Sequence, residues 1–226
     1  MERVSTGIPG LDELLEGGFP SGSLILLSGG PGTGKTTFGL SYIYHGSLSG
    51  EPGVFISLEE EPEQIVRNSE RFGWKIRNQI KSGKMDVVRL DLYDFSSLRS
   101  VIEENVLRLN ARRIVIDPAT ILGMFLEHPL EIRKGLVELG KQLKKTGATS
   151  IISCEIPEGS TSVSPYGVEE FVSDGIVVLR RVMEGNMYTR VLSILKMRGT
   201  NHSTRLHPVR IGPGGIEVFS KEEVFI

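Results

Sequence analysis

The residues best suited to chemistry form the segment Gly29-Gly30-Pro31-Gly32-Thr33-Gly34-Lys35-Thr36, which fits the phosphate-binding pattern Gly-x4-Gly-Lys-Ser/Thr. An apolar run, residues 24–27, precedes it, so the loop should join a strand to a helix. Glycines let such a loop fold around phosphate oxygens with its N–H groups pointing inward, and the helix N-terminus adds positive potential. A glycine-rich turn that binds nothing would not need Lys and Thr at its end. The segment therefore predicts a nucleotide-binding protein.

Within this loop the side chains have separate expected roles. Lys35 has the reach for the β- and γ-phosphates of ATP, and the Thr36 hydroxyl can ligate Mg²⁺. The residues expected to contact the nucleotide from this segment are Gly30, Pro31, Gly32, Thr33, Gly34, Lys35, Thr36 and Thr37.

Three carboxylates follow apolar strands and suit the remaining steps of phosphoryl transfer to water. Asp117 ends the strand 113–117 and is the natural partner of Thr36 in holding Mg²⁺. Glu59 and Glu60 follow the strand 54–58, which we expect to neighbour the loop strand, at the edge where ligands bind to open α/β sheets. One of them can orient and deprotonate the attacking water, and we favour Glu59. The alternative is that both belong only to the acidic first turn of the next helix.

A basic cluster comes late in the chain: Lys196, Arg198 and His202, at the end of a strand and in the following turn. Alone, such a cluster is typical of a solvated hairpin end. Combined with a nucleotide site, it can supply positive charge to a phosphate, from the same subunit or from a neighbouring one.

The elements that must position these residues alternate along most of the chain. Apolar runs predict strands at 24–27, 54–58, 87–90, 113–117 and 150–153. Helices are expected between them, at 35–49, from Pro62, at 96–109 and around 132–143. This alternation predicts an α/β fold with a mostly parallel, twisted sheet flanked by helices. The last strands, 176–179, 190–195 and 209–211, follow without helices and should be antiparallel additions to one edge.

Composition sets the broad class. The chain has 226 residues, 39% hydrophobic and 24% charged, with a formal net charge of −2. We expect one domain over residues 1–226 and no general affinity for nucleic acid. Cys154 is the single cysteine, so neither an intrachain disulfide nor a thiolate metal cluster can form. No apolar run approaches the roughly 20 residues of a membrane span, and no secretory signal is evident, so a cytoplasmic location is expected.

With these motifs, the sequence resembles the KaiC-like branch of the RecA/RadA superfamily of ATPases. The resemblance covers residues 5–12, the phosphate loop, 55–60, 114–117, 166–174 and 196–200, and the last two segments are the most specific. It implies a RecA-like P-loop fold and rings, typically hexamers, with ATP at subunit interfaces. It also implies that Lys196 and Arg198 of one subunit reach the γ-phosphate held by the next. The first glutamate of the acidic pair matches the superfamily's catalytic position, which agrees with Glu59.

Three departures from the family pattern narrow the expectation. The clock proteins of this type carry two tandem copies, whereas this chain has one. Where their autokinase copy has adjacent Ser and Thr, this chain has Glu170 and Phe171, so self-phosphorylation by that route is not expected. The stretches that match DNA-binding loops, 118–129 and 156–170, contain no Lys or Arg, which disfavours DNA binding.

The resulting expectation is a Mg²⁺-dependent ATPase that hydrolyses ATP slowly in a ring and serves regulation or assembly. Two alternatives stay open. One is a recombinase paralogue that modulates DNA repair. The other is a nucleotide-gated scaffold with little turnover, which would bind a protein partner through the basic residues between 67 and 84.

Overall fold

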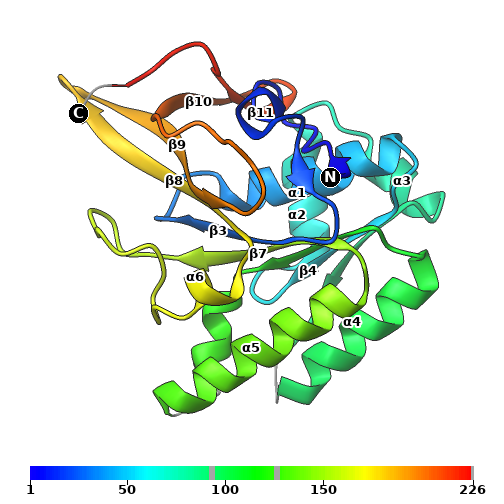
Figure 1. The fold of residues 1–226 in the computed structure, drawn as a ribbon. Coiled ribbons are helices and arrows are strands. Elements are labelled where there is room, and N and C mark those ends of the chain that lie inside the picture. Colours follow the sequence, from blue (N-terminus) through cyan, green and yellow to red (C-terminus); the bar gives the residue numbers. More distant parts are fainter. Residues whose placement is uncertain (92–94, 125–127, 225–226) are drawn as a thin grey trace.

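The computed structural model describes residues 1–91, 95–124 and 128–224. Its centre is a nine-stranded sheet with the order β11-β10-β9-β8-β3-β7-β6-β4-β5 (Figure 1). The strands are β3 (Leu24–Gly29), β4 (Gly53–Ser57), β5 (Met85–Arg89), β6 (Arg113–Asp117), β7 (Thr149–Glu155), β8 (Gly175–Glu184), β9 (Met187–Met197), β10 (His207–Gly212) and β11 (Gly215–Val218). A small separate sheet pairs β1 (Arg3–Val4) with β2 (Phe19–Pro20).

Helices cover both faces of the large sheet (Figure 1). They are α1 (Lys35–Leu48), α2 (Pro62–Glu70), α3 (Ile76–Lys81), α4 (Phe95–Leu109), α5 (Pro129–Lys145) and the short α6 (Glu169–Val172), with 3-10 turns η1 (Asp12–Leu15) and η2 (Ala119–Met124). One apolar cluster joins α1, α2 and α3 to one face, and another joins α4 and α5 to the opposite face. The expected α/β fold with antiparallel edge strands is confirmed.

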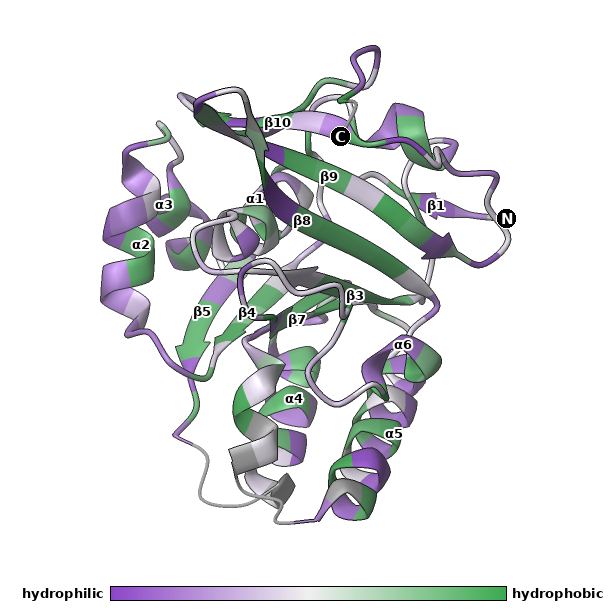
Figure 2. Cartoon of the chain, turned by 90° about the vertical axis from the view of Figure 1, so that its left-hand side faces the viewer, coloured by the Kyte–Doolittle hydropathy of each residue, from purple (hydrophilic) through white to green (hydrophobic). Residues whose placement is uncertain are grey.

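The central strand β3 contributes to both clusters. All six of its residues are buried. Because successive strand residues point to opposite faces, Ile25 and Leu27 belong to the α1 side, whereas Leu24 and Leu26 belong to the α5 side. Figure 2 shows that the strands of the sheet are mostly hydrophobic, whereas the helices around them mix hydrophobic and hydrophilic residues. This two-sided burial explains why the parallel strands read as continuous apolar runs.

Two expectations about strand order were wrong. β4 does not neighbour β3, because β7 and β6 lie between them. β8 is not an antiparallel addition, since it pairs in parallel with β3 from Ile25↔Gly175 to Gly29↔Leu179. The connection through α6 returns the chain to the end of the sheet where the parallel strands begin, so β8 runs in the same direction as β3. Only the two-residue turn after β8 reverses the direction, and β9, β10 and β11 are antiparallel as expected.

The expected cost of damaging the centre of this sheet can be measured. Leu26 is fully buried in β3, so Leu26→Ala should lower the free energy of unfolding by about 2–5 kcal/mol through lost burial and a residual cavity. Leu107 on α4 is 82% exposed, and Leu107→Ala is the matched control, expected to change it by no more than about 0.5 kcal/mol. Equilibrium urea unfolding of both variants and the parent gives the comparison. Equal stability of the two variants would contradict the assignment of β3 to the core.

Candidate nucleotide-binding site

The glycine-rich loop joins the end of β3 to the start of α1, where the sequence predicted it. Gly32 and Gly34 have φ values of +69° and +106°, which side chains other than glycine rarely adopt. A Cβ atom on Gly34 would also lie 2.6 Å from Cδ1 of Ile211 on β10. The loop shape therefore depends on glycine for its backbone angles, and Gly34 also packs closely against Ile211 of β10.

Lys35 lies inside this loop. Its side chain is only 8% exposed, and its Nζ donates hydrogen bonds to the carbonyl oxygens of Gly29 at 3.0 Å and Gly30 at 3.1 Å. Oε1 of Glu155, at the end of the neighbouring strand β7, lies 3.6 Å from the same nitrogen. The ammonium group is thus held at the centre of the loop, where phosphate oxygens would be surrounded by backbone N–H groups.

Thr36 and Asp117 meet beside the loop. The Thr36 hydroxyl donates to Oδ2 of Asp117 at 2.8 Å, and the Ser153 hydroxyl donates to the other carboxylate oxygen. Burial raises the pKa of Asp117 above its ordinary value, although these two hydrogen bonds and the charge of Lys35 oppose that effect. Two adjacent oxygen ligands from a hydroxyl and a carboxylate suit Mg²⁺, which usually takes the rest of its shell from phosphates and water. The residues present therefore fit the ion.

Glu59 and Glu60 reach the same site although their strand lies further away than expected. Parallel strands end at one edge, so the end of β4 still faces the loop across β7 and β6. Both glutamates line a cleft of about 580 Å³ together with Lys35, Thr36 and Asp117. Glu59 is exposed, whereas burial and the charges of Asp117 and Glu59 raise the pKa of Glu60. Two carboxylates thus border the space beside the phosphate loop.

Lys196 and Arg198 lie at the opposite end of the strands, where the parallel strands begin. Gly175 pairs with Ile25 on one side and with Met197 on the other, so the end of β9 is level with the start of β3. The loop begins four residues further along β3, about 13 Å away at the usual rise per strand residue. His202 lies in the segment between β9 and β10, with Nδ1 2.9 Å from the Ser203 carbonyl oxygen. The structure does not bring these three residues to the loop of their own chain.

Two arginines at the cleft were missed by the sequence reasoning. Arg190 donates from Nε to the Gly32 carbonyl oxygen at 3.1 Å and lines the cleft, as does Arg71 at the end of α2. Arg190 begins the strand that was expected over 190–195. Antiparallel pairing of β9 with β8 places Arg190 level with the end of β3. The register of this hairpin therefore identifies Arg190 as a cleft residue.

The loop between β3 and α1, with Thr36 beside Asp117 at the carboxyl edge of a parallel sheet, defines a P-loop protein with a RecA-like fold. The family profile described as "ATPase: KaiC" matches residues 4–223. The chain belongs to this family of KaiC-type ATPases.

Individual relatives agree with the family assignment. The circadian clock oscillator protein KaiC of Synechococcus elongatus is 36% identical over 228 residues, and the match covers 96% of this chain but 44% of that protein. A UPF0273 protein of Methanopyrus kandleri is 41% identical, with coverage of 100% of this chain and 95% of that one. The crystal structure of a KaiC-like protein from Pyrococcus horikoshii matches with a TM-score of 0.90 at 41% identity, covering 96% of this chain and 99% of that chain.

The glycine requirement of the loop gives a direct test of the site. Gly34→Ala should weaken binding of a fluorescent ATP analogue at least about tenfold, because the new methyl group displaces Ile211 and strains the loop that holds phosphate. Gly50 also has a positive φ, of +81°, but a Cβ there meets nothing within 4 Å, so Gly50→Ala is the control for strain alone. Fluorescence titration measures both. Affinity equal to that of Gly50→Ala would contradict a phosphate site at this loop.

Proposed function

We propose that this chain is a Mg²⁺-dependent ATPase that works as a ring of copies, with each site shared between two subunits. The observation that carries the proposal is the division of charged groups between the two edges of one sheet. Lys35, Thr36 and Asp117 gather at the carboxyl edge, whereas Lys196 and Arg198 lie at the other. A site that needs both sets is completed only by a second copy.

The chain's own residues have distinct roles in this proposal. The loop N–H groups and Lys35 bind the phosphates of ATP, together with Gly30, Thr33 and Thr37. Thr36 and Asp117 would hold Mg²⁺, which when bound neutralises charge on the phosphate oxygens. Glu59 orients the attacking water and accepts its proton, with Glu60 beside it. Turnover is expected to be slow and to depend on correct placement of these groups.

The second subunit contributes positive charge. Phosphoryl transfer spreads negative charge over the equatorial oxygens, and an arginine supplied from another protein can stabilise it. Arg198 is 57% exposed and follows the end of β9, which is level with the start of β3 and not with the loop, as expected for a group that serves a neighbouring site. Lys196 and His202 belong to the same segment. We propose a hexameric ring, and a regulatory role like that named for the clock protein, which is more than twice as long as this chain.

The two alternative functions receive less support. A protein-binding role for the basic residues between 67 and 84 is weakened because Arg77 pairs with Glu63 and Glu70, so the surface is partly neutralised. Recombinase-like DNA binding would use the stretches 118–129 and 156–170, which contain no Lys or Arg, although 125–127 lie outside the described part of the chain. Among the residues that the structure describes, no helix is long and apolar enough to cross a membrane.

Removal of the proposed base tests the ATPase assignment. Glu59→Gln should lower kcat at least about hundredfold while leaving ATP affinity within about twofold, because the amide keeps the shape but cannot accept the proton. Glu104 on α4 is exposed and does not line the cleft, so Glu104→Gln is the matched control and should hydrolyse ATP like the parent. Phosphate release and ATP titration measure the two quantities. If Glu60→Gln alone abolished turnover, the roles of the two glutamates would be reversed.

Action between subunits is tested by mixing defective copies. Lys196→Ala/Arg198→Ala and Glu59→Gln should each have little turnover alone. Mixed rings contain interfaces in which an intact Glu59 faces an intact Lys196 and Arg198, so part of the activity should return. Native mass spectrometry confirms that the rings are mixed, and phosphate release measures the activity. Fully mixed rings with no recovered turnover would contradict a site shared between subunits.

A further inference from the structure

Asp174 joins the start of the P-loop strand to Arg198. The residue lies between α6 and β8, where its backbone N–H donates to the Leu24 carbonyl at 2.8 Å and its Oδ2 accepts from the Leu24 N–H at 3.1 Å. On its other side, its carbonyl accepts from the Arg198 N–H at 3.0 Å and its Oδ1 accepts from Arg198 Nη1 at 2.9 Å. Asp174 therefore holds one strand by two hydrogen bonds and the arginine by two more.

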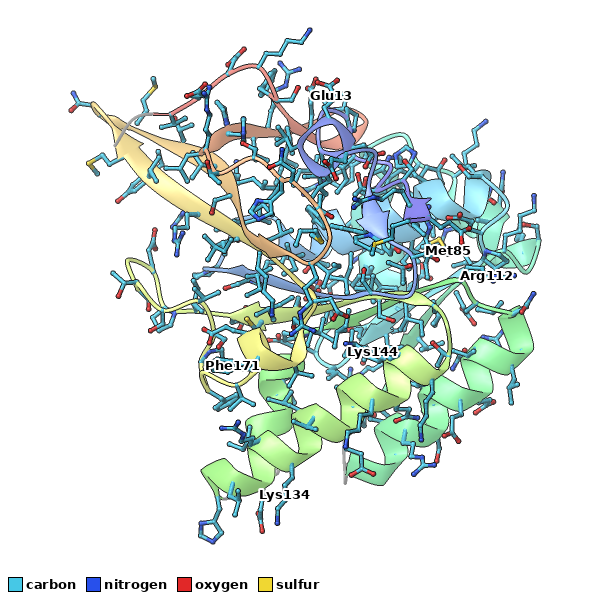
Figure 3. The ribbon with its side chains drawn as sticks, viewed as in Figure 1. Glu13, Met85, Arg112, Lys134, Lys144 and Phe171 are labelled. Atoms are coloured by element: carbon cyan, nitrogen blue, oxygen red, sulfur yellow. The ribbon has the colours of Figure 1, made fainter. Side chains whose placement is uncertain are left out.

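The carboxylate is well suited to remain charged. Its side chain is 16% exposed, and burial alone would raise its pKa. Hydrogen bonds from Lys144 and the Leu24 amide, with the charges of Lys144 and Arg198, instead hold the pKa of Asp174 below its ordinary value. Lys144 comes from α5, which lies next to α6 and its exposed Phe171 (Figure 3). A fixed negative charge is thus present beside Arg198 at neutral pH.

Arg198 keeps donors for a second partner. A guanidinium carries five N–H donors, and Asp174 engages the group through Nη1, while the side chain as a whole is 57% exposed. Lys196 is held in a comparable way, because its Nζ donates to the carbonyl oxygens of Glu170 at 2.9 Å and Ser173 at 2.7 Å. The segment that ends at Asp174 therefore restrains both cations before any phosphate arrives.

We infer that Asp174 is a positioning residue, which fixes the guanidinium of Arg198 for contact with the phosphates of ATP bound to a neighbouring copy. This inference rests on the proposed function. Ordering a long arginine side chain costs conformational entropy, and a partner within the same subunit removes that cost from the reaction. The competing explanation is that Asp174 only fastens β3, β8 and β9 together, and the two explanations predict different results.

Asp174→Asn keeps the size and one acceptor oxygen but removes the charge that holds Arg198. It should lower kcat about tenfold and leave ATP affinity within about twofold, because misplacement of a catalytic group by about 1 Å acts on the reaction and not on the subunit's own loop. Asp86 on β5 is also partly buried and paired with an arginine, Arg108, so Asp86→Asn is the matched control and should have parent turnover. Phosphate release and ATP titration measure both variants.

A double variant separates positioning from general stability. If Asp174 acts through Arg198, Asp174→Asn/Arg198→Ala should have the same residual turnover as Arg198→Ala. A further tenfold fall in the double variant, or parent turnover in Asp174→Asn, would overturn the inference while leaving the shared site intact. Parent turnover in Arg198→Ala would instead refute the proposed role of Arg198 between subunits, and this inference with it.

One more variant covers the case in which Asp174→Asn does not fold, as judged by circular dichroism and native mass. Arg198→Lys leaves every hydrogen bond of Asp174 to β3 in place but replaces the planar fork with a shorter point charge. It should lower kcat at least about tenfold, because one ammonium group cannot replace the guanidinium, which donates to Asp174 with one N–H group and keeps others for a phosphate. Parent turnover in Arg198→Lys would overturn the positioning role.

Discussion

The parallel register of β3 with its neighbours is the constraint on which the rest of the site depends. Parallel strands present their carboxyl ends together, so the loop after β3, Asp117 at the end of β6 and the glutamates after β4 share one edge without being close in sequence. The same register carries β8 in parallel and the β9 hairpin back again, which takes Lys196 and Arg198 to the opposite edge. Separation of these two groups is therefore a property of the topology, and no movement of a side chain can remove it.

Local patterns made half of the site predictable. The conformation of the loop at residues 29–36 is determined locally, because its glycines, Lys35 and Thr36 are adjacent in sequence. The loop needs only a strand before it and a helix after it. The position of Asp117 beside Thr36 was predictable, because an aspartate that ends an apolar parallel strand lies at the same edge of the sheet as the loop. The strand order was not predictable: β4 was expected beside β3, and only pairing over more than a hundred residues puts β7 there. The cleft residue Arg190 was missed for the same reason, because its place follows from the β8–β9 register.

The residues that hold Lys196 and Arg198 were also not predictable from the sequence. Asp174 and Arg198 are separated by the whole β8–β9 hairpin, and their contact exists because that hairpin closes with Gly175 opposite Met197. Glu170 holds Lys196 through a carbonyl oxygen, which any residue could supply, so its type gives no signal. Its side chain instead accepts a hydrogen bond from Ser164.

In the proposed ring, a site divided between two subunits would link nucleotide binding to assembly. A ligand that contacts two subunits at once stabilises their interface by the free energy of those added contacts, and by the same linkage the interface raises the affinity for the ligand. Lys35 is buried inside the loop of its own chain, whereas the Arg198 guanidinium is exposed at the other end of the strands. In the proposed ring, the contacts of the loop would form within one chain and those of Arg198 would need two. Affinity for ATP would then depend mainly on the loop, and the dependence of turnover on protein concentration would report the contribution of Arg198.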